Sequence, residues 1–314
     1  MTAKRKFASL MVMVCAAACV LSVSAKTLKV LMIGNSFSIC VGNKLPQIVN
    51  SFPGHSLELT SAYIGGCPLD KHVRNIKAAE QDPKKGLYLV SIWNSAKLGK
   101  PKTYNGNLID LLKKQQYDIV TIQQSSMKSW NWKTYEPSAG ELISFIRKYQ
   151  PKAEIVIHQT WAYRLDSPRF KKFGFDQTGM YERLRDSYGK LAAKYQLRVI
   201  PMGDAVQLFR KYTPVKFQVS AEKWEYPKLP SDAGDVVGGS YWRKDAKTGK
   251  MKLAFDAHHL NADGHYLQAC LWFAFLYGEP AGKITWMPKD MRKDFAVLLR
   301  QCAQEALASY RQVK

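Results

Sequence analysis

The chain has 314 residues, of which 46% are hydrophobic and 23% charged, a balance typical of a folded globular protein. This composition excludes a wholly disordered chain and a fibrous repeat. Lys and Arg together number 47 against 25 for Asp and Glu, and the net charge of +22 favours acidic partners such as anionic glycans, lipid head groups or nucleic acid.

Residues 1–25 have the pattern of an export signal. Three positive charges at positions 4–6 precede an uncharged apolar run over 7–21, and Val23-Ser24-Ala25 supplies small residues before Lys26. The apolar run is shorter than the roughly 20 residues that a membrane-spanning helix needs. An alternative is a lipoprotein signal that presents Cys19 for acylation. We therefore expect an exported protein, periplasmic or secreted, with no stable membrane span and no nucleic acid among its partners.

Strand-like and helix-like segments alternate over residues 26–280. Apolar runs predict strands at 28–33, 57–63, 119–123, 155–159 and 199–201. Helical patterns predict helices at 43–52, 179–195, 205–212, 262–277 and 289–311. Because strands separated by helices form parallel sheets covered on both faces, we expect a three-layer α/β/α sandwich. Its mostly parallel sheet is expected to be flavodoxin-like, with about five strands.

Two stretches interrupt this alternation. Residues 88–104 contain glycine, proline and Trp93, and are interpreted as an excursion from the sheet. Residues 213–255 form a longer, lysine-rich insertion with a hairpin-like segment at 241–253, and loops of this length are usually functional or disordered. Residues 281–314 are predicted to form a C-terminal helical extension packed on the domain that spans 26–280.

The cysteines outside the export signal are Cys40, Cys67, Cys270 and Cys302. Export places them in an oxidising compartment, where four cysteines allow three pairings that the sequence cannot distinguish. The chain has no CxxC pair, which argues against a thiolate zinc site.

Gly34-Asn35-Ser36 stands where the first predicted strand turns into a helix. Glycine permits a tight turn there, and the serine hydroxyl would lie at the carboxyl edge of the sheet, where ligands bind in open α/β folds. The helix N-terminus can also stabilise a nearby negative charge. The plain alternative is that Asn35 or Ser36 caps the helix.

Residues 256–265 hold three of the six histidines, immediately before an apolar helix. Asp256 and His259 are three residues apart, so a base and the carboxylate that orients it can lie on one turn, as hydrolysis by a serine requires. One alternative is a capped helix with solvated histidines. Another is a metal site of Asp256, His258, His259 and His265, although no HExxH motif supports it.

Together the two segments resemble the SGNH, or GDSL-like, hydrolase superfamily, in which a serine follows the first strand and a DxxHL block lies near the C-terminus. Gly34-Asn35-Ser36 stands where the superfamily has Gly-Asp-Ser, and Asp256 and His259 match the DxxHL block. The resemblance implies that Ser36 is the nucleophile, His259 the base and Asp256 its orienting carboxylate. It implies that His258 is a neighbour only, and that no metal or organic cofactor is needed.

Two further blocks of the superfamily supply the oxyanion hole, the donors that stabilise the negative oxygen of a tetrahedral intermediate. The segment 64–67 resembles the block whose glycine N–H is one donor, with Gly66 the better match. The GxND block is missing, and Gln123-Gln124-Ser125-Ser126 takes its place. Because a glutamine amide can donate the same hydrogen bond, the expected donors are Ser36, Gly66 and Gln124, with Ser126 as second candidate for the third.

Aromatic residues follow two predicted strands at the same sheet edge. Trp130 and Trp132 follow one, and Trp161 and Tyr163 follow the next. Aromatic rings can stack on sugars, so the expected substrate-binding residues are Trp130, Trp161, Tyr163 and Asn35, with core packing as the alternative for each ring. Cys40 and Cys67 are also expected near this edge, either as a disulfide or as two thiols.

These features predict an exported serine esterase that removes O-acetyl or similar acyl groups from a carbohydrate. The alternatives are a catalytically silent glycan-binding protein on the same fold, and a lipid or short-chain carboxylesterase. The substrate is an acylated glycan or another small ester. Lysines in the 213–255 insertion would attract it if it is anionic, and they are Lys216, Lys223, Lys228, Lys244, Lys247, Lys250 and Lys252.

Overall fold

A computed structural model describes residues 27–220 and 222–311, and the expected export signal with Cys19 lies outside these residues. The strands of the main sheet are β1 (Leu28–Gly34), β2 (Leu57–Tyr63), β3 (Tyr88–Asn94), β4 (Lys97–Gly106), β5 (Ile119–Ile122), β6 (Glu154–His158) and β7 (Arg198–Ile200). A separate two-stranded ladder contains β8 (Val237–Lys244) and β9 (Met251–Leu260).

The helices form around these strands in chain order. They are α1 (Ser36–Ile39), α2 (Leu45–Asn50), α3 (Leu69–Gln81), α4 (Leu108–Lys114), α5 (Ser138–Tyr149), α6 (Arg169–Phe173), α7 (Gln177–Tyr195), α8 (Met202–Tyr212), α9 (Ala262–Tyr277) and α10 (Lys293–Arg311). None of the helices in the described residues is long and apolar enough to cross a membrane.

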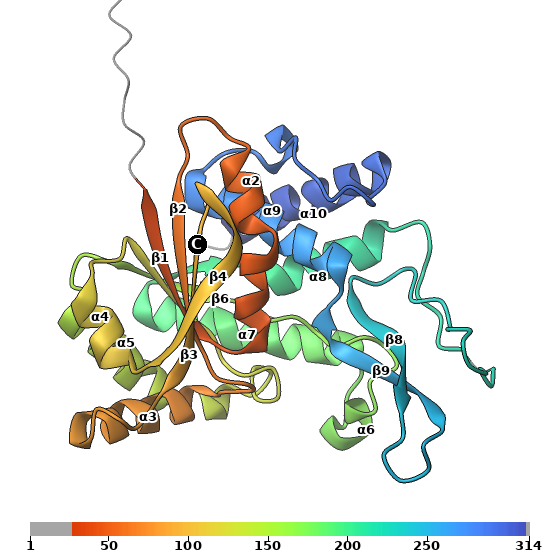
Figure 1. Ribbon diagram of the computed structural model, residues 1–314, viewed down its shortest axis with the longest axis horizontal. Helices are drawn as coiled ribbons and strands as arrows, with labels where there is room; N and C mark the ends of the chain where they lie inside the picture. Colours follow the sequence, from red (N-terminus) through yellow and green to blue (C-terminus); the bar gives the residue numbers. More distant parts are fainter. Residues whose placement is uncertain (1–26, 221, 312–314) are drawn as a thin grey trace, which may run out of the picture.

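The main sheet has seven strands in the order β4-β3-β2-β1-β5-β6-β7. The five predicted strands, β2, β1, β5, β6 and β7, run parallel in a flavodoxin-like order. Helices α3, α4 and α5 pack together on one side, while α2 packs against α9 and α10 covers α8 and α9 (Figure 1). The predicted three-layer α/β/α fold is confirmed.

Burial on both sides of the sheet explains the apolar runs in the sequence. Residues 30–33 of β1 are at most 1% exposed, as is typical of a parallel strand covered by helices on both faces. Helix α9 is apolar around its whole circumference because it lies between β7 and α10. The core therefore reaches both elements that carry the predicted catalytic segments, at the end of β1 and the start of α9.

The interpretation of residues 88–104 as an excursion was wrong. They form β3 and most of β4, which extend the sheet beyond β2 as antiparallel strands. Gly99 and Pro101 suggested a loop, but β4 is the outermost strand, where a proline is tolerated because the outer row of backbone groups needs no partner. Exposed lysines along β4, such as Lys100, also discourage edge-to-edge association.

The 213–255 insertion contains the expected hairpin in a longer form. Strands β8 and β9 pair from Lys244 and Met251 up to Val237 and Leu260. The DxxH segment is therefore the end of a strand, not a free turn before α9. In Figure 1 this hairpin projects away from the main sheet.

All four described cysteines are buried thiols, so the alternative of a Cys40–Cys67 disulfide was wrong. The Cys40 thiol donates to Oε1 of Gln268 (3.1 Å), whereas the Cys67 sulfur lies 3.6 Å from Nδ1 of His72. Burial raises the pKa of both thiols to about 12, so neither forms a thiolate at neutral pH.

Candidate active site

Ser36 is the first residue of α1, directly after the carboxyl end of β1. Asn35 caps this helix, and its Oδ1 accepts a hydrogen bond from the N–H of Phe37 (3.0 Å). Glycine at position 34 leaves room for two side chains, because a Cβ there would lie 2.5 Å from Oγ of Ser38 and 3.1 Å from Cδ of Gln123. The half-buried Ser36 is thus presented at the sheet edge by a rigid turn.

A hydrogen-bond relay joins this serine to the end of β9. Nε2 of His259 lies 2.8 Å from Oγ of Ser36, and Nδ1 of His259 lies 2.6 Å from Oδ2 of Asp256. Oδ1 of Asp256 accepts from the N–H groups of His258 (2.7 Å) and His259 (3.1 Å). The structure therefore brings together the three residues expected to form a catalytic triad.

The carboxylate of Asp256 is held in its charged form. Partial burial alone would raise its pKa, but the His259 ring and the two N–H groups more than offset this, so its pKa lies well below the usual value. A charged Asp256 keeps the proton on Nδ1 of His259. Nε2 is then free to accept the proton of Ser36.

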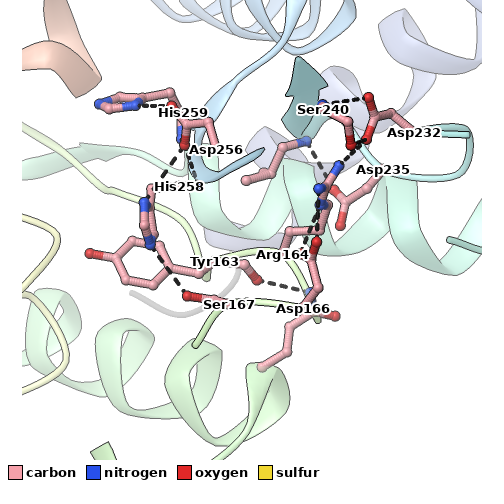
Figure 2. A network of polar contacts seen from close by, with 12 residues as sticks. Tyr163, Arg164, Asp166, Ser167, Asp232, Asp235, Ser240, Asp256, His258 and His259 are labelled. Atoms are coloured by element: carbon pink, nitrogen blue, oxygen red, sulfur yellow. Dashed lines mark hydrogen bonds and ion pairs between the residues drawn. The ribbon is translucent and has the colours of Figure 1, made fainter. Parts of the chain in front are cut away.

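His258 points away from the relay. Figure 2 shows its ring on the other side of Asp256 from His259, directed toward Ser167. Its Nε2 lies 3.3 Å from Oγ of Ser167 and 3.2 Å from Nε of Arg169. Burial, followed by the charge of Arg169, lowers the pKa of His258. Nδ1 of His258 lies 3.6 Å from Oδ1 of Asp256, but of the two adjacent histidines only His259 contacts Ser36.

Of the three aromatic residues expected to bind substrate, Trp130, Trp161 and Tyr163, the expectation was wrong for Trp161 and Tyr163. Trp161 is completely buried and Tyr163 is 1% exposed, so neither presents a face to a ligand. Trp161 stacks on Phe37 and donates from Nε1 to the carbonyl of His258 (2.8 Å). Trp130 is half-buried and packs on the rings of Phe173 and Phe175. Trp161 thus contacts the residues next to Ser36 and His259 instead of a ligand.

Asn35 was also wrongly expected to bind substrate, because it is 1% exposed and belongs to a buried network. Its Oδ1 accepts from Nε2 of Gln123 (2.7 Å), and Oε1 of Gln123 lies 2.8 Å from Nδ1 of His158. Gln268 lies 3.3 Å from the other ring nitrogen of His158 and donates to the carbonyl of Phe37 (3.0 Å). Burial lowers the pKa of His158 to about 3, which keeps it neutral. This network supports the turn that carries Ser36.

The expectation that the Gln124 amide is the third donor of the oxyanion hole was wrong. Its side chain is fully buried, and Nε2 donates to the carbonyl and hydroxyl oxygens of Thr134 (2.9 and 3.3 Å). Its Oε1 accepts from the N–H groups of Leu69 and Ser125. Ser126 is half-buried, and its hydroxyl lies 2.9 Å from that of Tyr163.

Gly66 has the properties of an oxyanion donor. It occupies a turn closed by a hydrogen bond from the N–H of Cys67 to the carbonyl of Ile64 (3.2 Å). Its φ of +59° is a conformation that favours glycine. The residue is exposed, and its own N–H donates no hydrogen bond within the described residues. The turn is tied to the nucleophile, since Nδ2 of Asn35 donates to the carbonyl of Cys67 (3.1 Å).

Arg164 anchors β8 and β9 to the sheet edge, a role that the sequence analysis missed. Its guanidinium, 1% exposed, pairs with Asp166 (2.8 Å) and Asp232 (2.6 Å). The backbone N–H of Arg164 donates to the carbonyl of Ala257 (2.8 Å). Asp232 in turn accepts from the N–H and hydroxyl of Ser240, as Figure 2 shows. No local pattern reveals this cluster because Asp232 lies far from Arg164 in sequence.

The alternative of a metal site finds no support in the part of the chain that the structure describes, where no group of three or more His, Cys, Asp or Glu side chains could hold a metal ion. His265, one of the four suggested ligands, lies 3.4 Å from the Asn43 amide. Burial and the charge of Lys44 lower the pKa of His265 to about 4.

The fold and site define a three-layer α/β protein with a Ser–His–Asp relay at the carboxyl edge of its sheet. The chain belongs to the DUF4886 family, a domain of unknown function, whose model matches residues 29–224. That range contains Ser36 and Gly66 and ends before β8.

The chain is similar to a DUF4886 family protein from Bacteroides uniformis, with 24% identity over 90% of this chain and 95% of that one and a TM-score of 0.71. This likeness shows a shared fold. Weaker likenesses are to a protein from Slackia heliotrinireducens provisionally assigned to the SGNH hydrolases (18% identity, 78% and 96% covered, TM-score 0.46) and to a catalytic mutant of an acetylxylan esterase from Geobacillus stearothermophilus (11% identity, 79% and 92% covered, TM-score 0.39). No curated protein sequence matches the chain.

Proposed function

We propose that this protein is an exported serine esterase that hydrolyses O-acyl esters, O-acetyl esters foremost, on a carbohydrate. The observation that carries the proposal is the relay from Asp256 through His259 to Ser36, with contacts of 2.6 and 2.8 Å. Both distances are within the range of a nucleophile activated by an oriented base.

The reaction proceeds in two proton-balanced halves. Oγ of Ser36 attacks the ester carbonyl carbon while its proton passes to Nε2 of His259. The tetrahedral intermediate then expels the sugar alcohol, which takes that proton from His259 and leaves an acyl group on Ser36. Water attacks the acyl-serine, gives a proton to His259 and releases the carboxylic acid as the proton returns to Ser36.

The negative oxygen of each intermediate accepts from backbone N–H groups. The N–H of Ser36 stands at the first position of α1, where no intrahelical partner exists, and the N–H of Gly66 is exposed. The half-buried hydroxyl of Ser126 is the side-chain candidate for a third donor in place of the engaged Gln124 amide.

The exposure of the triad favours a small acyl group on a large substrate. The side chains of His259 and Asp256 are 46% and 35% exposed, so an ester on the outside of a polymer can reach them. A long acyl chain would need an apolar channel beside the serine. A cavity of about 650 Å³ does not serve this purpose, because it is lined by residues of α8, α10, the 213–235 segment and the start of α9 and by none of the triad.

One observation favours a second candidate, a catalytically silent glycan-binding protein. The engaged Gln124 amide removes the side-chain donor that stands nearest in sequence to the superfamily's GxND asparagine. An oxyanion hole with two backbone donors would then be weaker than one with three, since each donor contributes about 10²–10³ in kcat.

Turnover and covalent labelling distinguish these candidates. We expect the wild type to hydrolyse aryl acetates and acetylated polysaccharides, and a serine-directed phosphonate to add to Ser36, as mass mapping would show. Ser36→Ala should lose turnover and labelling while keeping its circular dichroism spectrum. Ser51→Ala is the control, because that hydroxyl bonds the carbonyl of Ile48 at the end of α2. A folded wild type without turnover or labelling would support the silent glycan-binding protein instead.

The export component of the proposal rests on the pattern of residues 1–25. N-terminal sequencing of protein recovered from the periplasm or medium should find Lys26 first. Protein that keeps Met1 in the cytoplasm would contradict export.

A further inference from the structure

The register of the β8–β9 hairpin shows which side chains share a face with Asp256. Gly239, Tyr241 and Arg243 pair with Asp256, Ala254 and Lys252 respectively, in an unbroken antiparallel ladder. Because directly opposite residues and every second residue project to the same side, these six positions form one face. We call it the Asp256 face.

The opposite face of the hairpin is covered in part by the chain, over Ser240 and Trp242, while Phe255 and Met251 on that face remain 46% and 40% exposed. Nε1 of Trp242 donates to the carbonyl of Lys228 (3.0 Å), and its ring meets that of Tyr226 edge-on at 5.9 Å. The Ser240 hydroxyl donates to Asp232 (2.9 Å) on the same side. The segment that precedes β8 therefore packs on the Trp242 side and leaves the Asp256 face open.

The open face combines an aromatic ring with two cations. Tyr241 is 47% exposed, and the small Ala254 opposite it leaves the ring uncovered. Arg243 and Lys252 are exposed, and neither side chain forms a hydrogen bond or salt bridge within the described residues. The nearby Asp245 carboxylate accepts from the backbone of Lys247 and Thr248, and these hydrogen bonds, followed by the charge of Lys252, lower its pKa.

This arrangement places two like charges opposite each other on the Asp256 face. Like charges directly opposite each other on a ladder destabilise it, and Arg243 and Lys252 are such a pair. Buried arginines elsewhere in the site have carboxylate partners, as Arg164 has in Asp166 and Asp232 and Arg210 has in Asp235. An anion between Arg243 and Lys252 would turn the repulsion into two charge-assisted hydrogen bonds.

The position of this pair sets the distance from the reacting ester. Lys252 precedes Asp256 by four steps along the strand, which corresponds to about 13 Å at 3.3 Å per residue. Tyr241 lies between them on the same face. An anionic group bound there would belong to the same polymer as the ester at Ser36, several bonds removed from it.

We propose that the Asp256 face of the hairpin is a binding subsite for a carboxylate-bearing sugar of an acylated acidic polysaccharide. Arg243 and Lys252 bind the carboxylate, and Tyr241 packs on the adjoining sugar ring. The inference deepens the proposed function, since it names the substrate class that the triad would deacylate. It assigns substrate binding to Arg243 and Lys252 alone among the many cations near this hairpin, because these two lie opposite each other on the open face. Lys216, another lysine of the 213–255 insertion, donates instead to the carbonyls of Arg210 and Lys211 at the end of α8.

A charge-matched pair of double variants tests the subsite. Arg243→Gln with Lys252→Gln removes two charges from the Asp256 face, while Lys244→Gln with Lys247→Gln removes two from the opposite face and the hairpin turn. Calorimetric binding of unacylated oligogalacturonate requires no catalysis. We expect the first double variant to lose at least about tenfold in affinity, the loss of one charge-assisted hydrogen bond, and the second less than about twofold.

Steady-state kinetics provide a second test of the subsite. On acetylated polygalacturonate the first double variant should raise KM, while kcat on a neutral aryl acetate stays that of the wild type. Equal losses of affinity in both double variants, or none in either, would overturn the subsite. So would equal activity of the wild type on acetylated acidic and neutral polysaccharides. Binding without any ester turnover would refute the proposed function and leave the carboxylate subsite standing.

Discussion

The indole N–H of Trp161 donates to the carbonyl of His258 across 2.8 Å, one residue before the histidine that contacts Ser36. The same ring stacks on Phe37, one residue after Ser36, with centroids 4.2 Å apart and planes inclined by 21°. One fully buried side chain thus touches the neighbours of both partners in the Ser36–His259 hydrogen bond. Its position sets the spacing between α1 and β9.

Trp161→Phe should therefore lower activity more than stability alone explains. The stacking surface is largely kept, but the carbonyl of His258 loses its donor, which costs about 1–3 kcal/mol. A small displacement of His259 should lower kcat on an aryl acetate by about tenfold or more. Trp272→Phe is the matched control, because Trp272 is equally buried and its Nε1 has no partner among the described residues. Equal kcat values in the two variants would contradict the positioning role.

The two adjacent histidines should differ sharply in their contribution to turnover. His259→Ala removes the base and should lower kcat by several orders of magnitude, as loss of a triad member does. His258→Ala breaks contacts with Ser167 and Arg169 and a longer contact with Asp256 (3.6 Å) but none with Ser36, so kcat should fall far less. Steady-state kinetics on an aryl acetate measures both, with thermal unfolding to show that each variant folds. The reverse ranking would place the base one residue earlier.

Gly66→Ala tests the backbone donor of the oxyanion hole. A Cβ at Gly66 meets no atom within 4 Å, so the cost is conformational, about 1–2 kcal/mol for a side chain at a φ of +59°. The turn should rotate and misdirect its N–H, lowering kcat by about 10²-fold. Gly54→Ala is the control, since Gly54 has a φ of +81° and also meets nothing within 4 Å. If both variants keep full kcat while losing similar stability, Gly66 is not a donor.

Acid should destabilise the fold through its buried neutral histidines. Burial lowers the pKa of both His158 and His72 to about 3, against 6.5 for an ordinary histidine. Between those values the unfolded chain binds protons that the folded chain does not, so stability is lost as pH falls from about 6.5 toward about 3. Each such group contributes a slope of about 1.4 kcal/mol per pH unit.

His158→Asn isolates one of these contributions. The variant should be less stable than the wild type at pH 8, where the hydrogen bonds of His158 to Gln123 and Gln268 matter most. Between pH 6 and pH 4 its free energy of unfolding should depend on pH less steeply, by about 1.4 kcal/mol per unit. Urea unfolding at a series of pH values measures both quantities. Parallel pH profiles would show that His158 titrates normally.

The sequence by itself determined the parallel core of the fold and the identity of the three relay residues. Apolar runs separated by helical patterns indicate parallel strands that helices cover on both faces, because a strand buried on both faces consists almost entirely of apolar residues. The carboxyl ends of parallel strands meet at one edge, which placed Ser36 there, and the resemblance to the SGNH superfamily joined the DxxH segment to it. The match of Asp256 and His259 to the DxxHL block of that superfamily also distinguished His259 from His258.

Only the tertiary structure decided which polar and aromatic groups remain free to act. Gln124 is saturated by Thr134 and Leu69, and Trp161 is buried between Phe37 and His258. The pairing of β4 at the sheet edge and the two faces of the β8–β9 hairpin likewise depend on partners elsewhere in the chain. A hydrogen bond or a buried face requires two segments of the chain. When these segments lie tens of residues apart, the local sequence pattern of one does not identify the other.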